Sequence, residues 1–204
     1  MKRKRVGILV FNKVEVLDFC GPFEVMAAVR LDEARRREEP SPFDIVLVAE
    51  YGTAITANGG LRVIPDYALA DCPPLDILIV PGGWGVRQEI GNEPLLAWIA
   101  ERSRQVETLA SVCTGAMLLG RAGLLEGRRA TTHWTTLGWM RESFTHVTVE
   151  DQLLFVEDGI IVTSAGVSAG IDMALRLVAR YYGEDIARAT ARHMEYHYLE
   201  TNTR

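Results

Sequence analysis

The chain has 204 residues, of which 48% are hydrophobic and 24% are charged, and its formal net charge at pH 7 is −5. This length suits one domain over residues 1–204, and the acidic balance argues against nucleic-acid or anionic-membrane partners. No apolar run approaches the ~20 residues that span a bilayer, and the basic start lacks the apolar region of a signal peptide. Three widely spaced cysteines without a CxxC pair favour reduced thiols over disulfides or a zinc site, so we expect a cytoplasmic protein.

The first half of the chain alternates buried-strand and helical patterns. In order, these patterns predict a strand (residues 5–10), a helix (21–28), a strand (43–49), a hairpin (53–56 and 61–65), a strand (76–80) and a helix (92–104). Pro22 suits a first helical turn, which places Asp18 just before the helix. Asp18 is flanked by two apolar residues, so it is either the N-cap of that helix or a catalytic carboxylate.

The second half of the chain continues this alternation. The patterns predict a strand (106–110), a helix (116–122), a short strand (129–132), a helical stretch (133–140), three short strands (147–150, 153–156 and 160–163) and two helices (171–182 and 185–198). Strands that alternate with helices are typical of an open, doubly wound α/β sheet, whose ligand site lies at the carboxyl ends of the strands. We therefore expect the site among the residues that follow the strands.

Cys113 lies between a predicted strand and a predicted helix, with no room for a loop. A residue at such a junction sits on a sharp, often strained turn, and its side chain projects over the carboxyl end of the sheet. This is the geometry of a nucleophile elbow, here with Cys in place of Ser. The start of the following helix favours a thiolate over a thiol. A buried structural cysteine is the alternative, and the spacing alone does not separate the two.

A glycine-rich segment follows the strand at residues 76–80 and contains Gly82 and Gly83. Glycine lets backbone N–H groups approach a ligand closely, so the N–H groups of Gly83 and Thr114 are candidates for an oxyanion hole. A tight turn that needs glycine for its shape is the alternative. The segment is not a phosphate loop, because no Lys-Ser/Thr follows it.

The remaining candidates for lining a pocket are Trp84, His133, Val167 and Ser168. His133 lies at a strand-to-helix junction, but a histidine beside a tryptophan is more often packed and hydrogen-bonded than a base. His193 and His197 share one face of the predicted last helix at i and i+4. That spacing can bind a metal, but without a third ligand or an HExxH pattern we expect no metal site.

Four stretches follow one another along the chain: LDFCGPFEV, DILIVPGGWG, ASVCTGAMLLGRAGLLEGRRATTHW and TSAGVSAGIDMAL. Together they resemble the DJ-1/PfpI (ThiJ) superfamily, most of all the branch that holds isocyanide hydratases and the DJ-1/PfpI domains of AraC-type regulators. The resemblance implies a flavodoxin-like three-layer α/β/α sandwich with a mostly parallel sheet, and a homodimer. It also implies a reactive cysteine at Cys113 and, at Asp18, the carboxylate beside that sulfur.

The chain departs from parts of this superfamily. Thr114 stands where the protease-like branch has a histidine after the cysteine, which argues against protease activity. The chain stops at Arg204, without the helix-turn-helix domain of the regulators and without the longer tail expected of an isocyanide hydratase. Cys20, two residues after Asp18, is a candidate for tuning or resolving the oxidation of Cys113.

These residues give a hypothesis for the hydration of a small electrophile, such as an isocyanide, to an N-formamide. The Cys113 thiolate attacks carbon, Asp18 supplies and retrieves protons, and the N–H groups of Gly83 and Thr114 stabilise negative charge. A carboxylate near a thiolate is expected to have a raised pKa. The reaction needs a small-molecule substrate but no metal or organic cofactor. Two non-enzymatic alternatives stay open: a redox-sensing stress protein with a Cys113 sulfinate, and a stand-alone ligand-binding module.

Overall fold

The computed structural model of the chain describes residues 2–198 and 201–204. At its centre lies a seven-stranded sheet with, in spatial order, β10 (Phe155–Asp158), β11 (Ile161–Ser164), β7 (Thr108–Ser111), β6 (Ile77–Val80), β1 (Lys4–Leu9), β2 (Phe43–Ala49) and β5 (Tyr67–Ala68). Neighbouring strands are parallel, except that β10 runs antiparallel to β11. The mostly parallel sheet agrees with the sequence-based prediction.

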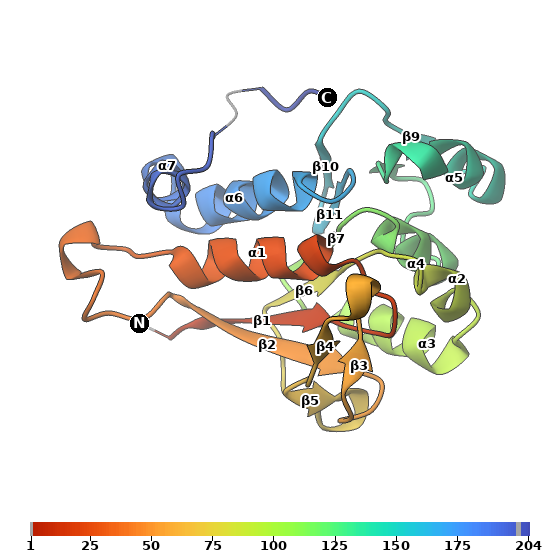
Figure 1. The fold of residues 1–204 in the computed structure, drawn as a ribbon. Helices are drawn as coiled ribbons and strands as arrows, with labels where there is room; N and C mark the ends of the chain where they lie inside the picture. Colours follow the sequence, from red (N-terminus) through yellow and green to blue (C-terminus); the bar gives the residue numbers. More distant parts are fainter. Residues whose placement is uncertain (1, 199–200) are drawn as a thin grey trace.

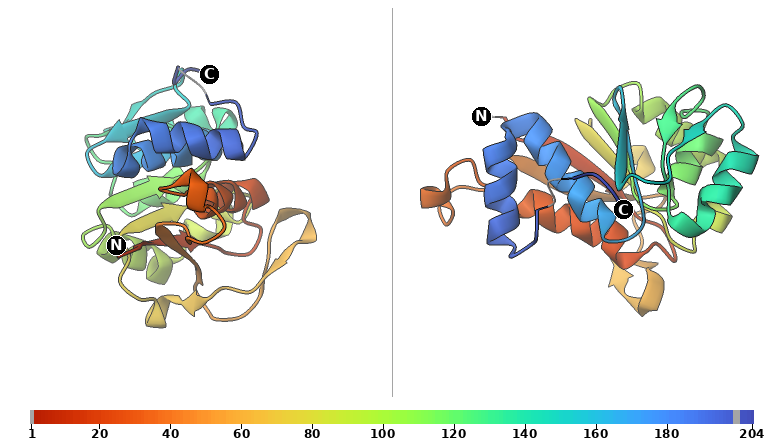
Figure 2. Two further views of the ribbon diagram at one scale, coloured as in Figure 1. Left: turned by 90° about the vertical axis from the view of Figure 1, so that its left-hand side faces the viewer. Right: turned by 90° about the horizontal axis from the view of Figure 1, so that it is seen from above.

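Helices cover both faces of this sheet (Figures 1 and 2). One face carries α1 (Val16–Ala28), α6 (Ala169–Tyr182) and α7 (Glu184–His193), and the other carries α2 (Val86–Glu89), α3 (Glu93–Arg102) and α4 (Gly115–Arg121). Outside the sheet lie a hairpin of β3 (Ile55–Thr56) and β4 (Arg62–Val63), a parallel pair of β8 (Arg129–Ala130) and β9 (Thr148–Val149), and α5 (Leu137–Ser143). The result is a doubly wound, flavodoxin-like sandwich.

The strand order brings three distant segments of sequence to one edge. After β1 the chain moves to β2 on one side, and it then returns to β6 on the other side of β1. The loops after β1 and β6 therefore diverge, which creates the crevice in which such folds bind ligands. The loop after β7 lies next to them. Asp18, the glycine-rich loop and Cys113 follow these three strands, so the topology gathers them at one place.

Helix α1 begins at Val16, earlier than the predicted start at residue 21. Pro22 therefore lies inside the helix, and Asp18 occupies its first turn with Glu15 at the N-cap position. Of the two alternatives for Asp18, the N-cap is therefore wrong, and so is the placement of Pro22 in a first turn. Proline removes one intrahelical hydrogen bond. In this part of the chain α1 packs closely against α6, because a Cβ added to Gly21 would lie only 3.1 Å from Ile171.

Helix α7 ends at His193, short of the predicted end near residue 198. Glu195 has a φ of +53°, a conformation that a right-handed helix does not contain. His193 and His197 therefore do not share a helix face, and the predicted i, i+4 pair is wrong. Residues 2–198 and 201–204 contain no cluster of three His, Cys, Asp or Glu side chains arranged to hold a metal ion. None of the helices in that part of the chain has the length and apolar character needed to cross a membrane.

Candidate active site

Cys113 occupies the turn that joins β7 to α4. Its φ of +57° lies in the left-handed region, where a residue with a side chain is strained. Neighbouring segments hold this conformation. The Cys113 N–H donates to the carbonyl oxygens of Ser164 (3.2 Å) and Ala165 (3.0 Å), and the Thr132 hydroxyl donates to the Cys113 carbonyl oxygen (2.9 Å). These bonds fix the direction in which the sulfur points.

The Cys113 residue is only 6% exposed, and this burial governs its acidity. The pKa of the thiol is raised to about 12, first by burial and then by the charge of Asp18, while the backbone N–H groups of Thr114 and Val167 oppose the shift. The prediction that the start of α4 favours a thiolate is therefore wrong for the resting protein. Loss of solvation is the largest cause of the raised pKa, and Cys113 rests as a thiol beside a carboxylate.

Asp18 is fully buried in the first turn of α1. Its Oδ2 accepts a hydrogen bond from the Gly82 N–H at 3.0 Å. Its Oδ1 has no partner in hydrogen-bonding geometry in the described chain, although the Cys113 thiol and the Val167 N–H lie near the carboxyl. Burial raises the pKa of this carboxyl to about 7, against lowering contributions from the Gly82 N–H and the Cys113 thiol. The direction matches the expectation, but the main cause is burial. A carboxyl that titrates near neutral pH can both accept and donate a proton.

The glycine-rich loop after β6 packs directly on the elbow. A Cβ on Gly82 would lie 2.5 Å from both the backbone nitrogen and Oγ1 of Thr114. The Gly83 N–H donates to Thr114 Oγ1 at 3.0 Å, so it is not free to bind an oxyanion as the sequence suggested. The Thr114 N–H instead acts on the Cys113 sulfur, whose pKa it lowers. Of the two expected donors, only Thr114 is therefore available, and Gly83 positions its side chain.

A cavity of about 160 Å³ lies beside Cys113. Trp84, His133 and Val167 line this cavity, whereas Asp18, Gly82 and Ser168 do not. Gly82 contacts Asp18 instead, and Ser168 lines a neighbouring cavity that also borders His133. The wall contains four further residues that the sequence did not point to: Glu15, Arg87, Thr135 and Thr136.

His133 forms part of the cavity wall and is anchored by its neighbours. It precedes a short 3-10 helix, Trp134–Thr136, and its Nδ1 lies 2.7 Å from Thr135 Oγ1. Burial, followed by the charge of Arg204, lowers the pKa of the imidazole. His133 is therefore neutral near pH 7. This agrees with a packed, hydrogen-bonded histidine.

Cys20 lies on α1 but does not line the cavity beside Cys113. Two residues along a helix correspond to a rotation of about 200°, so Cys20 and Asp18 point to different sides of α1. In the described chain Cys20, Cys72 and Cys113 are all free thiols. Burial alone raises the pKa of the Cys20 thiol, with no contribution from Asp18 or Cys113.

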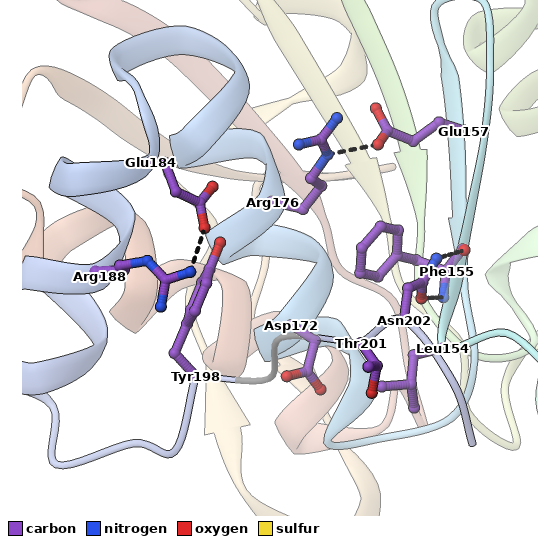
Figure 3. Close-up of a pocket in the computed structure, with 10 residues that line it drawn as sticks. All are labelled: Leu154, Phe155, Glu157, Asp172, Arg176, Glu184, Arg188, Tyr198, Thr201 and Asn202. Atoms are coloured by element: carbon purple, nitrogen blue, oxygen red, sulfur yellow. Dashed lines mark hydrogen bonds and ion pairs between the residues drawn. The ribbon is translucent and has the colours of Figure 1, made fainter.

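A larger cavity, of about 330 Å³, lies between α6, α7, β10 and residues 201–202 (Figure 3). Its arginines are paired with acidic neighbours. Arg176 Nε lies 2.6 Å from Glu157 Oε1, and Arg188 Nη2 lies 3.4 Å from Glu184 Oε1. None of the residues that line it is a cysteine, serine or histidine. We therefore place the candidate active site at the smaller cavity.

The sequence profile of the DJ-1/PfpI family matches residues 4–180, a range that contains the elbow, Asp18 and the glycine-rich loop. The chain belongs to the DJ-1/PfpI family. A relative within this family, the isonitrile hydratase of Pseudomonas putida, is 36% identical over 198 residues, which cover 94% of this chain and 78% of that protein. The HTH-type transcriptional regulator GbdR of Pseudomonas aeruginosa is 34% identical over 138 residues, or 68% of this chain and 37% of the regulator.

Solved structures of DJ-1/PfpI proteins have the same fold. A ThiJ/PfpI family protein from Pseudomonas syringae superimposes with a TM-score of 0.84 at 29% identity, covering 96% of this chain and 76% of that chain. Drosophila melanogaster DJ-1beta superimposes with a TM-score of 0.79 at 18% identity, covering 96% of this chain and all of that one. At 18% identity, the likeness to DJ-1beta shows a shared fold and nothing more.

Proposed function

We propose that this DJ-1/PfpI chain is a cysteine-dependent hydratase that adds water to a small isocyanide and releases an N-formamide. One observation carries the proposal. A buried thiol on a strained elbow lies beside a buried carboxylate, and one oxygen of that carboxylate has no partner among the described residues. The 36% identity to an isonitrile hydratase, over 94% of this chain, supports the same chemistry. Addition of a thiol to an isocyanide requires no metal or organic cofactor.

The first half of the reaction forms the carbon–sulfur bond. Above pH 7 Asp18 is largely ionised, because its pKa is about 7. It takes the proton of the Cys113 thiol while Sγ attacks the isocyanide carbon, and it then delivers that proton to the same carbon. The product is a thioimidate, Cys–S–CH=N–R, and Asp18 is again a carboxylate.

The second half of the reaction adds water and releases the enzyme. Asp18 takes a proton from water while the water oxygen attacks the thioimidate carbon, and this proton passes to the substrate nitrogen. The carbon–sulfur bond then breaks, and the proton of the new hydroxyl group moves through Asp18 to Cys113. The released product, R–NH–CHO, contains the isocyanide and one water, and the thiol is restored.

Backbone donors stabilise the sulfur anion that forms in both halves. The N–H groups of Thr114 and Val167 lower the pKa of the Cys113 thiol, so they favour the anion at the moment of proton transfer. Val167, whose N–H acts on the sulfur, also has a strained backbone, with a φ of +52°. Gly83 contributes indirectly, because its N–H holds the Thr114 hydroxyl.

The test is detection of the N-formamide after incubation with an aryl isocyanide. We expect wild-type protein to form it, and Cys113→Ser to lower the rate at least ~10³-fold with an unchanged circular dichroism spectrum. Cys20→Ser is the matched control and should retain the wild-type rate, because Cys20 does not line the cavity. A Cys113→Ser rate close to that of wild type would exclude the covalent mechanism.

The two non-enzymatic alternatives give different results in the same experiment. If wild-type protein forms no formamide but peroxide converts Cys113 to a sulfinate, the hydratase proposal fails and a redox-sensing role replaces it. If neither reaction occurs, a ligand-binding module becomes the better description.

We further propose that the active form is a cytoplasmic homodimer in which each chain is one DJ-1/PfpI domain over residues 1–204. Membership of the family supports this assembly. Light scattering on the purified chain should give the mass of two chains. The mass of one chain would contradict the proposed dimer.

A further inference from the structure

The cavity beside Cys113 contains a cation that the hydration mechanism does not use. Arg87, in α2, lines this cavity together with Trp84. The guanidinium stacks over the Trp84 ring, but in the described parts of the chain its side chain has no ion pair and no hydrogen bond. An arginine of this kind differs from Arg176 and Arg188 in the larger cavity, which are both paired with glutamates.

The stack on Trp84 orients the Arg87 guanidinium. Its Cζ lies 4.4 Å from the ring centroid, and the two residues are three apart in the turn that begins α2. Stacking occupies the flat face of a guanidinium and leaves the N–H groups at its edge available. A carboxylate can accept two parallel hydrogen bonds from the N–H groups of one guanidinium. A lysine ammonium, which acts as a point charge, does not offer this planar pair of donors. Trp84 is 63% exposed, so this binding edge lies at the rim of the cavity.

The second charged group in the cavity wall is Glu15. Its Oε2 accepts a hydrogen bond from Asn58 Nδ2 at 2.8 Å, which draws the carboxylate toward the turn between β3 and β4. Within the described chain it forms no ion pair with Arg87, so the N–H groups of the guanidinium are not occupied by this carboxylate. The cavity therefore presents separate positive and negative groups, and a ligand anion is attracted to Arg87 and repelled by Glu15.

We infer that the substrate carries a carboxylate that binds Arg87 while its electrophilic carbon lies at Cys113. This inference rests on the proposed hydration and narrows its substrate class to small isocyanides with an anionic group. The volume of about 160 Å³ limits the distance between the two groups, because it accommodates only a small molecule. A compact ligand then spans from the Arg87 edge to the sulfur.

The test compares isocyanoacetate with its uncharged methyl ester, which carry the same reacting group. We expect wild-type protein to show a higher kcat/KM for the carboxylate. Arg87→Leu should lose about tenfold more kcat/KM for the carboxylate than for the ester, and Arg87→Lys should retain an intermediate preference. Glu15→Gln should raise the preference for the carboxylate, because it removes a like charge.

The matched control is Arg104→Leu, which makes the same change of net charge at an exposed residue beyond α3. It should leave both kcat/KM values at the wild-type level. A wild-type preference for the ester would overturn the inference and leave the hydration proposal standing. Equal losses for the two substrates in Arg87→Leu would do the same.

Failure of the hydration proposal is detected separately. If wild-type protein hydrates neither compound, calorimetric titration of isocyanoacetate into wild type and Arg87→Leu decides the ligand class. Binding that Arg87→Leu weakens about tenfold supports the carboxylate site. Binding of equal strength in the two proteins, or no binding to wild type, overturns it.

Discussion

The cavity beside Cys113 and the larger cavity between α6, α7 and β10 differ in how far the polar groups around them are satisfied. In the larger one (Figure 3), Arg176 is paired with Glu157, and Asp172 accepts a hydrogen bond from the Tyr196 hydroxyl at 3.1 Å. Beside the smaller one, Asp18 does not line the cavity but is fully buried next to Cys113, and its Oδ1 has no partner within residues 2–198 and 201–204. A buried polar atom without a partner destabilises the fold.

This difference identifies the site better than volume does, since the larger cavity has about twice the volume of the smaller. The smaller cavity also contains strained backbone at Cys113 and Val167, with φ values of +57° and +52°. Strain and unsatisfied polar groups both cost stability, and they are found together where a reaction uses them. The larger cavity is a well-paired surface feature.

The largest expected effect is on the rate of formamide formation, which should depend on residues at the smaller cavity and not on those at the larger one. Asp18→Asn keeps an oxygen that can accept from the Gly82 N–H but cannot carry a proton, so formamide formation at pH 8 should slow by about 10²–10⁴-fold. Asp172→Asn in the larger cavity should stay within about twofold of wild type, because Asp172 does not border Cys113. Equal losses in the two variants would contradict our choice of cavity.

The same substitution provides a control for misfolding. The charge of Asp18 raises the pKa of the Cys113 thiol, so Asp18→Asn should lower that pKa while activity falls. The rate of thiol alkylation as a function of pH measures it. An unchanged thiol pKa would show that the two side chains do not interact.

The second prediction concerns stability as a function of pH. The pKa of Asp18 is about 7 in the folded protein and 3.8 in the unfolded chain, so the folded state binds more protons between these values. Stability should therefore fall as the pH rises through this range, by about 3 kcal/mol between pH 5 and pH 8. Asp18→Asn removes this dependence. Urea unfolding at both pH values measures the effect, and an identical pH dependence of wild type and variant would contradict the burial of a titrating Asp18.

The smallest expected effect concerns two glycines. A Cβ on Gly115, at the elbow, would lie 2.0 Å from the Val80 carbonyl oxygen, so Gly115→Ala should destabilise the fold by roughly 1–3 kcal/mol. A Cβ added to Gly138 in α5 would meet no neighbouring side chain or packed segment within 4 Å, so Gly138→Ala should stabilise the fold by up to about 1 kcal/mol. The midpoint of thermal unfolding should therefore fall for Gly115→Ala and rise for Gly138→Ala. Similar midpoints would show that the elbow has room to adjust.

The sequence predicted the elements that position the site, because long apolar strands and strand-to-helix junctions leave clear patterns. Cys113 at its junction and the strands before and after the glycine-rich loop were found in this way. The four-residue helix α2 is too short to leave a periodic pattern, so Arg87 had no signal. The start of α1 was mistaken because Pro22 usually marks a first turn, whereas here it lies inside a helix that begins at Val16.

Acidity and hydrogen bonding at the site could not be predicted from sequence. The pKa of Cys113 depends on burial by residues from several segments and on the charge of Asp18, and neither can be read from the sequence around Cys113. The Gly83 N–H is likewise occupied by the Thr114 hydroxyl, a contact between residues 31 positions apart. Both follow from tertiary packing.

The central claim is that the Cys113 sulfur bonds to the isocyanide carbon. The most direct measurement is peptide mass spectrometry of wild-type protein quenched in acid during turnover. We predict an adduct on the peptide that contains Cys113, with the added mass of one intact isocyanide, and none on the peptides that contain Cys20 or Cys72. Formamide release at the wild-type rate by Cys113→Ser, with no adduct on the wild-type Cys113 peptide, would contradict the account.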